Sequence, residues 1–254
     1  MSAEAGRGMS QDMTSLEQGK MVIQAALDRG RLTLSEHEAK QLLAAYGIPV
    51  TDELLLADPD ALPEALSSFE TPVVLKIDSP DILHKTEAGL VDLGCQTLED
   101  ARVSYKRIID RARERYPEAT INGVLIQEMV AGCVAECIVG MKKDPQFGPT
   151  ILFGLGGIFV EVLGDVALRI APLTGADADQ MVREIKGYGL LAGARGRPKA
   201  DVAAIAQVLL KMSRLALDLE PYLVEIDINP LMVLEEGRSA KAADALVLLE
   251  APAG

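Results

Sequence analysis

The chain is poor in several residue types, and each shortage narrows what the protein can be. Among its 254 residues are two histidines, three cysteines and no tryptophan. An odd number of cysteines without a CxxC pair forms neither a disulfide framework nor a recognisable zinc site. We therefore expect reduced, buried thiols in a cytoplasmic protein. No apolar run reaches the roughly 18–20 residues that span a bilayer, and the first 20 residues lack the apolar core of a signal peptide.

Positive charge is also scarce. The 25 Lys and Arg residues are outnumbered by 38 Asp and Glu residues, so the formal net charge is −13. A protein that binds a nucleic-acid backbone needs a surplus of Lys and Arg on one face. We therefore expect neither nucleic acid nor a membrane as a partner. Apolar residues make up 49% of the chain, which is enough for the core of one large domain or of two lobes.

Strand-like and helix-like segments alternate along the chain, which predicts an α/β or α+β fold of two lobes. A capping-box pattern, an apolar stripe and a terminating glycine predict a helix over 35–46. We place the boundary between the lobes where the strand expected over 123–130 leaves the first half. The expected division is a lead-in over 1–29, a first lobe over 30–130 and a second lobe over 131–254.

The strongest chemical signal lies in the last 30 residues. In "VEIDINP" apolar and oxygen-bearing residues alternate, so Glu225, Asp227 and Asn229 share the face away from the core. A tight turn after this strand places Asn229 directly opposite Asp244, with their Cβ atoms about 4.5–5.5 Å apart. Mg²⁺ binds such oxygen ligands. The alternative is a solvated outer face of an edge hairpin, and the isolated Asp244 among apolar residues makes the two interpretations about equal.

Two further features are typical of phosphate binding. Lys76 lies within an apolar strand, where a lysine is costly to bury unless it meets an anion. It suits a nucleotide phosphate, or it extends from the strand end into solvent. Gly156 and Gly157 allow backbone N–H groups to hold an anion, with Arg169 on the following strand. A tight turn is the commoner cause of such glycines, and the spacing is neither a Rossmann motif nor a P-loop.

Five segments, taken in order, resemble one family. They are "PVVLKIDSPDILHKTEAG", "GVLIQEMV", "DPQFGPTILFGLGGIFVEVLGDVALRIAPL", "GARGRPKAD" and "EIDINPLMV". They resemble the ATP-grasp subunit of ADP-forming acyl-CoA synthetases, the acetate–CoA ligases, which are relatives of the β subunit of succinyl-CoA synthetase. The resemblance runs from about residue 30 to residue 250. It implies an ATP-grasp fold with two lobes that clasp the nucleotide.

The resemblance also implies a reaction and its components. Acid, CoA and ATP are converted reversibly into acyl-CoA, ADP and phosphate through a phosphohistidine, with ATP/ADP and Mg²⁺ as cofactors. A CoA-binding α subunit is implied as partner, in an α₂β₂ assembly, and it would bind the acid and the CoA. Two other functions stay open: an ATP-grasp carboxylate–amine ligase that needs no phosphohistidine, and a nucleotide-sensing regulatory module.

Site residues follow from the resemblance by position. Asn229 and Asp244 match the Mg²⁺ ligands, in agreement with the expected hairpin register. His84 matches a histidine in a mobile loop that carries phosphate, so a neutral imidazole nitrogen would attack the γ-phosphorus. By itself His84 would pass for a surface histidine in a turn. The nucleotide-binding set implied by the family comprises Lys76 on the phosphates, Glu128 at the adenine-side hinge, Glu136 further along the cleft, and Gly156, Gly157 and Arg169 in the phosphate-handling loops.

Overall fold

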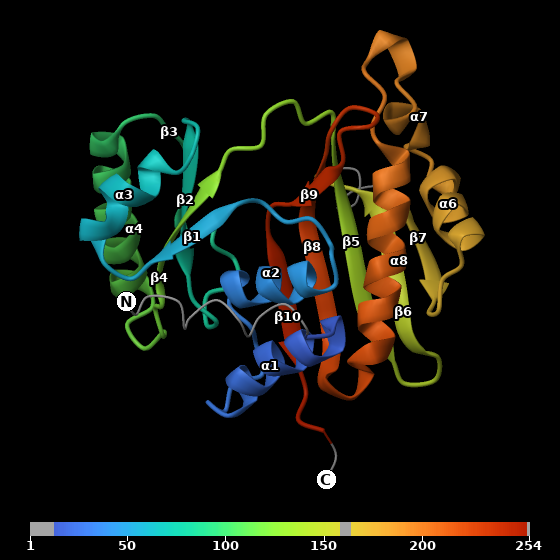
Figure 1. Cartoon of the computed structure of the whole chain (residues 1–254), viewed down its shortest axis with the longest axis horizontal. Coiled ribbons are helices and arrows are strands. Elements are labelled where there is room, and N and C mark those ends of the chain that lie inside the picture. Colours follow the sequence, from blue (N-terminus) through green and yellow to red (C-terminus); the bar gives the residue numbers. More distant parts are fainter. Residues whose placement is uncertain (1–12, 158–163, 253–254) are drawn as a thin grey trace, which may run out of the picture.

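Two antiparallel sheets form two lobes that meet along one side (Figure 1). The structure, a computed structural model, describes residues 13–157 and 164–252. Each sheet has its own apolar core, with helices packed against it. The expected α+β fold of two lobes is confirmed.

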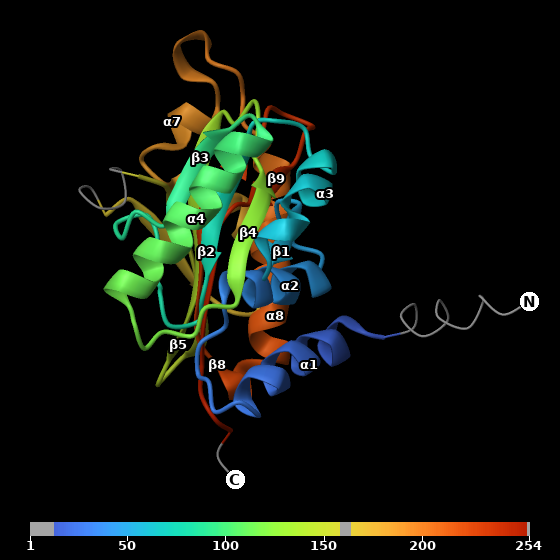
Figure 2. The same cartoon turned by 90° about the vertical axis from the view of Figure 1, so that its left-hand side faces the viewer.

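The smaller lobe is a four-stranded sheet with the spatial order β1-β4-β2-β3. Helix α4 lies against one face of this sheet (Figure 2). It does so because its buried side chains repeat at helical spacing, while charged residues occupy the rest of its surface. The elements are β1 (Glu53–Leu56), α3 (Leu62–Ser67), β2 (Val73–Asp78), β3 (Val91–Cys95), α4 (Leu98–Arg115) and β4 (Gly123–Glu128).

The larger lobe is a six-stranded sheet with the order β10-β8-β5-β6-β7. The sixth strand, β9, pairs with the C-terminal end of β8, on the same edge as β10. Helices α6 and α8 cover one face. No helix in the described part of the chain is both long and apolar enough to cross a bilayer. The elements are β5 (Ala135–Asp144), β6 (Gly148–Leu155), β7 (Val166–Ile170), α6 (Gly175–Glu184), α7 (Tyr188–Leu191), α8 (Val202–Asp218), β8 (Leu223–Val233), β9 (Ala240–Ala242) and β10 (Ala245–Leu249).

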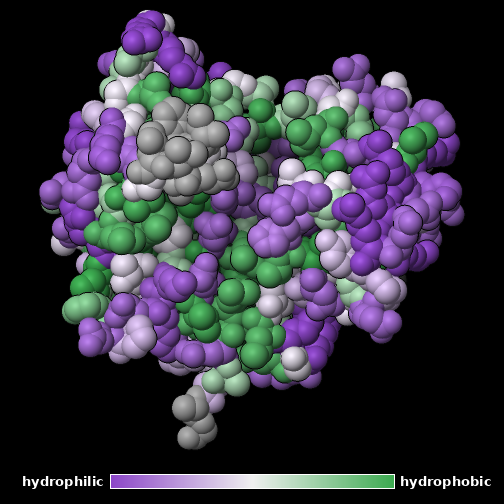
Figure 3. All heavy atoms as spheres, turned by 180° about the vertical axis from the view of Figure 1, so that it is seen from behind, coloured by the Kyte–Doolittle hydropathy of each residue, from purple (hydrophilic) through white to green (hydrophobic). Residues whose placement is uncertain are grey.

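The opposite face of the larger sheet is less covered. Seen from behind, apolar residues reach the surface between hydrophilic ones (Figure 3). On the edge strand β7, Leu168 is 52% exposed and Ile170 is 49% exposed. The helices therefore leave one side of this sheet accessible.

The first two helices, α1 (Ser15–Leu27) and α2 (Glu36–Ala45), pack with the larger lobe. Both begin with a complete capping box, as predicted for α2. Backbone hydrogen bonds tie the segment between them to the last strand: Leu34 N–H donates to Val247 O at 3.1 Å, and Leu249 N–H donates to Leu32 O at 2.8 Å. The expected start of the first lobe at residue 30 differs from this packing. Helical periodicity identifies a helix but not the sheet on which it packs.

The predicted register of the C-terminal strands is confirmed. On one side of Asn229, Ile228 pairs with Ala245, and on the other side Leu231 pairs with Ala242. Asn229 N–H donates to Asp244 O at 3.2 Å, so these two residues face each other between β9 and β10. The pairing of β8 with β5 slips by one residue at the same place. Such a bulge changes the direction of side chains.

The junction of β4 with β1 depends on a glycine. Gly123 has φ of +151°, and an added Cβ would lie 2.3 Å from the carbonyl oxygen of Leu56. We expect Gly123→Ala to lower the free energy of unfolding by about 1–3 kcal/mol, because the backbone of β1 would have to move. Chemical denaturation measures this. Gly175→Ala, at a helix start with no atom within 4 Å of the new Cβ, is the control and should cost nothing. Equal losses in the two variants would contradict the prediction.

Candidate active site between the lobes

A cavity of about 300 Å³ lies between the two lobes. The segment that joins β2 to β3 forms one wall, and β8 with the start of β10 forms the other. Three residues predicted from separate motifs line it together: His84, Asn229 and Asp244. The His84 side chain is exposed. The structure therefore brings the candidate nucleophile and the candidate metal ligands into one site.

A buried carboxylate belongs to one of the residues that line this cavity. Glu36, at the start of α2, lies within ion-pair distance of three lysines from different parts of the chain. Its oxygens are 2.8 Å from Lys40 Nζ, 2.9 Å from Lys76 Nζ and 3.1 Å from Lys85 Nζ. Burial alone would raise the pKa of Glu36, but the three ammonium groups hold that pKa well below its usual value. Glu36 therefore stays ionised, because protonating it would remove the anion that the three ammonium groups share.

Lys76 is buried, and its partners belong to the chain itself. Its ammonium group donates to Glu36 Oε1 at 2.9 Å and to the carbonyl oxygen of Ala243 at 2.7 Å. Ala243 precedes Asp244, so the lysine charge lies beside the candidate metal ligand. The alternative of a side chain reaching solvent does not hold, because Lys76 is 6% exposed.

The candidate metal ligand Asp244 and its neighbour Asp227 lie close to other carboxylates. Burial, with the nearby carboxylates of Glu225 and Asp244, raises the pKa of Asp227 to about 6. Burial and Glu36 also raise the pKa of Asp244, against the opposing effect of Lys85. No three His, Cys, Asp or Glu side chains converge as a metal cage within residues 13–157 and 164–252. The residues fit Mg²⁺, which commonly takes one or two protein oxygen ligands and completes its shell with phosphates and water.

A second cavity, of about 340 Å³, contains the residues expected further along the cleft. Glu136 and Gly156 line it with Arg197 and Cys133, and Gly156 N–H donates to Glu136 O at 2.7 Å. Gly157 follows with φ of +65°, a backbone conformation that favours glycine. The rest of the glycine-rich segment, 158–163, lies outside the described residues.

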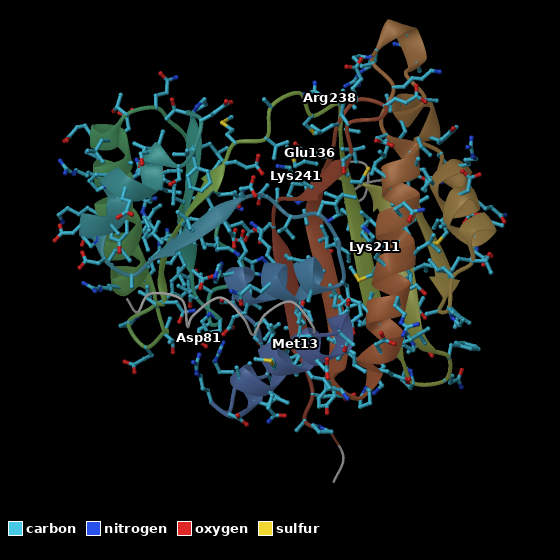
Figure 4. All side chains as sticks on the ribbon, in the orientation of Figure 1. Met13, Asp81, Glu136, Lys211, Arg238 and Lys241 are labelled. Carbon is cyan, nitrogen blue, oxygen red and sulfur yellow. The ribbon has the colours of Figure 1, made fainter. Side chains whose placement is uncertain are left out.

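Glu128 lies at the end of β4, where the chain passes from one lobe to the other. Its Oε1 accepts hydrogen bonds from Asp52 N–H at 2.8 Å and from Lys241 Nζ at 2.5 Å. Lys241 belongs to β9 and lies in one cross-strand row with Glu136 (Figure 4). This ion pair links the two lobes, and the place of Glu128 at an adenine-side hinge stays a prediction.

Arg169 lines neither of these two cavities. On β7 it pairs with Ile151, whose side chain is in the core beneath the helices. Its guanidinium group donates to both oxygens of Glu184, at 2.7 and 2.6 Å. These hydrogen bonds raise the pKa of Arg169. Its assignment to phosphate handling stays a prediction that this arrangement does not support.

Sequence reasoning missed Glu36, Lys40 and Lys85. Glu36 is an acidic residue in the first turn of a helix, where a carboxylate ordinarily serves the helix dipole. Lys85 follows His84 in a turn, where a lysine is ordinarily solvated, yet it is 8% exposed. The sequence feature that could have pointed to Lys85 was the number of charged residues around His84.

Comparison with known proteins agrees with this geometry. Residues 25–249 match the sequence profile of the ATP-grasp domain. The chain belongs to the ATP-grasp family. It is 44% identical over 229 residues to the β subunit of ADP-forming acetate–CoA ligase II of Pyrococcus furiosus, covering 90% of this chain and 97% of that one. It therefore belongs with the β subunits of ADP-forming acyl-CoA ligases, and the predicted family is confirmed.

Solved structures of this ATP-grasp family extend the comparison. Acetyl-coenzyme A synthetase 1 of Ca. Korarchaeum cryptofilum, in complex with coenzyme A and Ca-AMPCP, has a TM-score of 0.86 and 39% identity, over 91% of this chain and 100% of that one. The same enzyme with coenzyme A and Mg-AMPPCP, its phosphohistidine segment pointing towards the nucleotide binding site, has a TM-score of 0.78 and 37% identity over the same shares. These ligands agree with the predicted ATP/ADP and Mg²⁺. A β subunit of this family is one part of a ligase of more than one subunit.

The buried cluster gives a stability prediction. Glu36→Gln leaves three lysines without their shared anion, so we expect the free energy of unfolding to fall by about 3–5 kcal/mol. Chemical denaturation at neutral pH measures the loss. Asp110→Asn, which removes the exposed pair with Lys106, is the matched control and should cost less than about 1 kcal/mol. A loss from Glu36→Gln as small as that of the control would show that the cluster contributes little.

Proposed function

We propose that this chain binds Mg²⁺·ATP between its lobes and transfers the γ-phosphoryl group to His84, which passes it to a CoA-binding α subunit. The overall reaction is acid + CoA + ATP ⇌ acyl-CoA + ADP + phosphate. One observation carries the proposal: His84, Asn229 and Asp244 line a single cavity, although the segment that carries His84 is far in sequence from β8 and from the link between β9 and β10.

In this proposal His84 is the nucleophile. A lone pair of its neutral imidazole attacks the γ-phosphorus, the bond to the β-phosphate oxygen breaks, and ADP leaves with that electron pair. The phosphohistidine then delivers the phosphoryl group to the partner. The exposed position of His84 at the cavity wall suits both contacts, because the same imidazole has to reach the nucleotide and later the partner.

The surrounding charges would stabilise the phosphates. Asn229 and Asp244 would hold Mg²⁺, which when bound draws negative charge from the phosphate oxygens. Lys76, beside Asp244, would contact the same phosphates once it turns from Glu36. Glu128 would mark the adenine end, and Glu136, Gly156 and Gly157 would line the path between. The cross-lobe pair of Glu128 with Lys241 supports a hinge at that end.

The identity of the partner subunit is also a proposal. The β-subunit relatives imply a second subunit, and we propose that it holds the acid and the CoA, in an α₂β₂ complex. Cytoplasmic location remains part of this proposal. The carboxylate–amine ligase has no need for His84 beside the metal ligands, so the geometry favours the phosphohistidine route.

Phosphohistidine formation tests the function directly. The complex is incubated with γ-labelled ATP, and acid-labile, base-stable label is measured on the 27.1 kDa chain after the subunits are separated. We expect His84→Asn to abolish this label. His37→Gln, which changes the other histidine, is the control and should keep it. Full labelling of His84→Asn would place the phosphoryl group on another residue and rule out His84 as the nucleophile, while no label on the wild type would favour an amine ligase or a sensing module.

The metal ligands give a second test. We expect Asp244→Asn and Asn229→Ala each to weaken Mg²⁺·ADP binding about tenfold or more, because a charge-assisted contact of about 1.5–3 kcal/mol is lost. Calorimetric titration measures this. The same titration in EDTA, which removes the metal, is the control: there wild type and variants should bind ADP equally. Variants that match the wild type in the presence of Mg²⁺ would place the metal elsewhere.

A further inference from the structure

The segment that carries His84 is fastened at both ends. At its start, Asp81 Oδ2 accepts a hydrogen bond from Thr120 N–H at 2.7 Å. At its end, Arg115 donates to the carbonyl oxygen of Ala88 at 2.8 Å and Arg111 donates to that of Gly89 at 2.9 Å. Any movement of His84 is therefore confined to the residues between these anchors.

Between the anchors, two side chains point inward on either side of His84. Ile82 is buried in the core of the smaller lobe. Lys85 is 8% exposed, and its ammonium group lies 3.1 Å from Glu36 Oε2 and 3.3 Å from Asp244 Oδ1. Within the described part of the chain, Lys85 is the one residue of 82–87 whose side chain makes a hydrogen bond or an ion pair. Between the two anchors, Lys85 is thus the only side chain of residues 82–87 that makes a polar contact with the rest of the described structure.

The partners of Lys85 are already committed elsewhere. Glu36 is shared with Lys40 and Lys76, so its negative charge is divided among three ammonium groups. Asp244 lies at the metal side of the cavity, where Lys85 is its ion-pair partner. A divalent cation on the same carboxylate would repel the ammonium group and compete with it for the shared charge. The Lys85 contact and the bound cation therefore weaken each other.

We propose that Lys85 is a positioning residue that acts as a latch: it holds the His84 segment against the metal site until Mg²⁺·nucleotide takes Asp244 and loosens it. The inference rests on the proposed function, since it needs Asp244 to bind the metal. The latch makes movement of the His84 segment follow nucleotide binding, the order that the reaction requires. The segment becomes free to move only when a nucleotide is in place, so His84 does not leave an empty site.

Hydrogen exchange on the assembled complex tests the latch without relying on turnover. In the wild type we expect amide exchange of residues 82–87 to speed up about three- to tenfold when Mg²⁺·ADP is added, and not when ADP is added in EDTA. Lys85→Met should exchange fast even without ligand and change little on binding. Lys85→Arg, which keeps the charge, should behave as the wild type.

Calorimetry gives an independent measurement. The quantity is the factor by which Mg²⁺ strengthens ADP binding, so that any direct effect of Lys85 on the phosphates cancels. Without the competing ammonium group, Lys85→Met should raise this factor about three- to tenfold. An unchanged factor, or a wild-type segment that becomes more protected with Mg²⁺·ADP, would overturn the latch while leaving the function intact. Failure of the wild type to bind Mg²⁺·ADP would overturn both.

Discussion

The buried carboxylate of Glu36 is the constraint on which the site depends. This carboxylate, at the start of α2, pairs with a lysine from its own helix, a lysine from the inner strand β2 of the smaller sheet and a lysine from the His84 segment. Desolvating these charges is costly, and the cost is offset only when all of them are in place. The cluster therefore fixes the relative positions of α2, β2 and the His84 segment more strictly than apolar packing could. Apolar contacts tolerate sliding, but charged groups in a low-dielectric interior do not.

This arrangement also places the candidate phosphate ligand beside the candidate metal ligand. Lys76, the candidate phosphate ligand, is held by Glu36 and a backbone carbonyl beside Asp244. Its ammonium group is therefore fixed beside the candidate metal ligand, and it has to turn from Glu36 before it can contact a phosphate. The carboxyl groups of Asp227 and Asp244 lie close to further carboxylates, those of Glu225 and Glu36, which favours a bound metal ion. Lys85 is paired with Asp244 at the edge of this acidic group.

The sequence was sufficient where the signal was local and periodic. The strict alternation in "VEIDINP" and the tight turn after it determined the pairing of Asn229 with Asp244, since a slip by one residue would turn the apolar side chains into solvent. The two-lobed fold and the family followed from ordered motifs. The Glu36 cluster did not follow, because its members are 49 residues apart at most in sequence but meet only through tertiary packing. Nor did the pairing of Arg169 with Glu184, because a strand pattern does not tell which charged residue of a later helix will lie opposite.

The hydrogen bonds that tie Leu32 and Leu34 to β10 have a consequence for how the chain folds as it is made. The smaller lobe, from β1 to β4, is one continuous stretch inserted between two parts of the larger lobe. It has all its strands once residue 128 has left the ribosome. The residues around Leu34 lack their partner strand until β10 emerges. Helices α1 and α2 therefore keep an uncovered apolar surface until β10 has been made, and closure of the larger lobe joins segments that lie far apart in sequence.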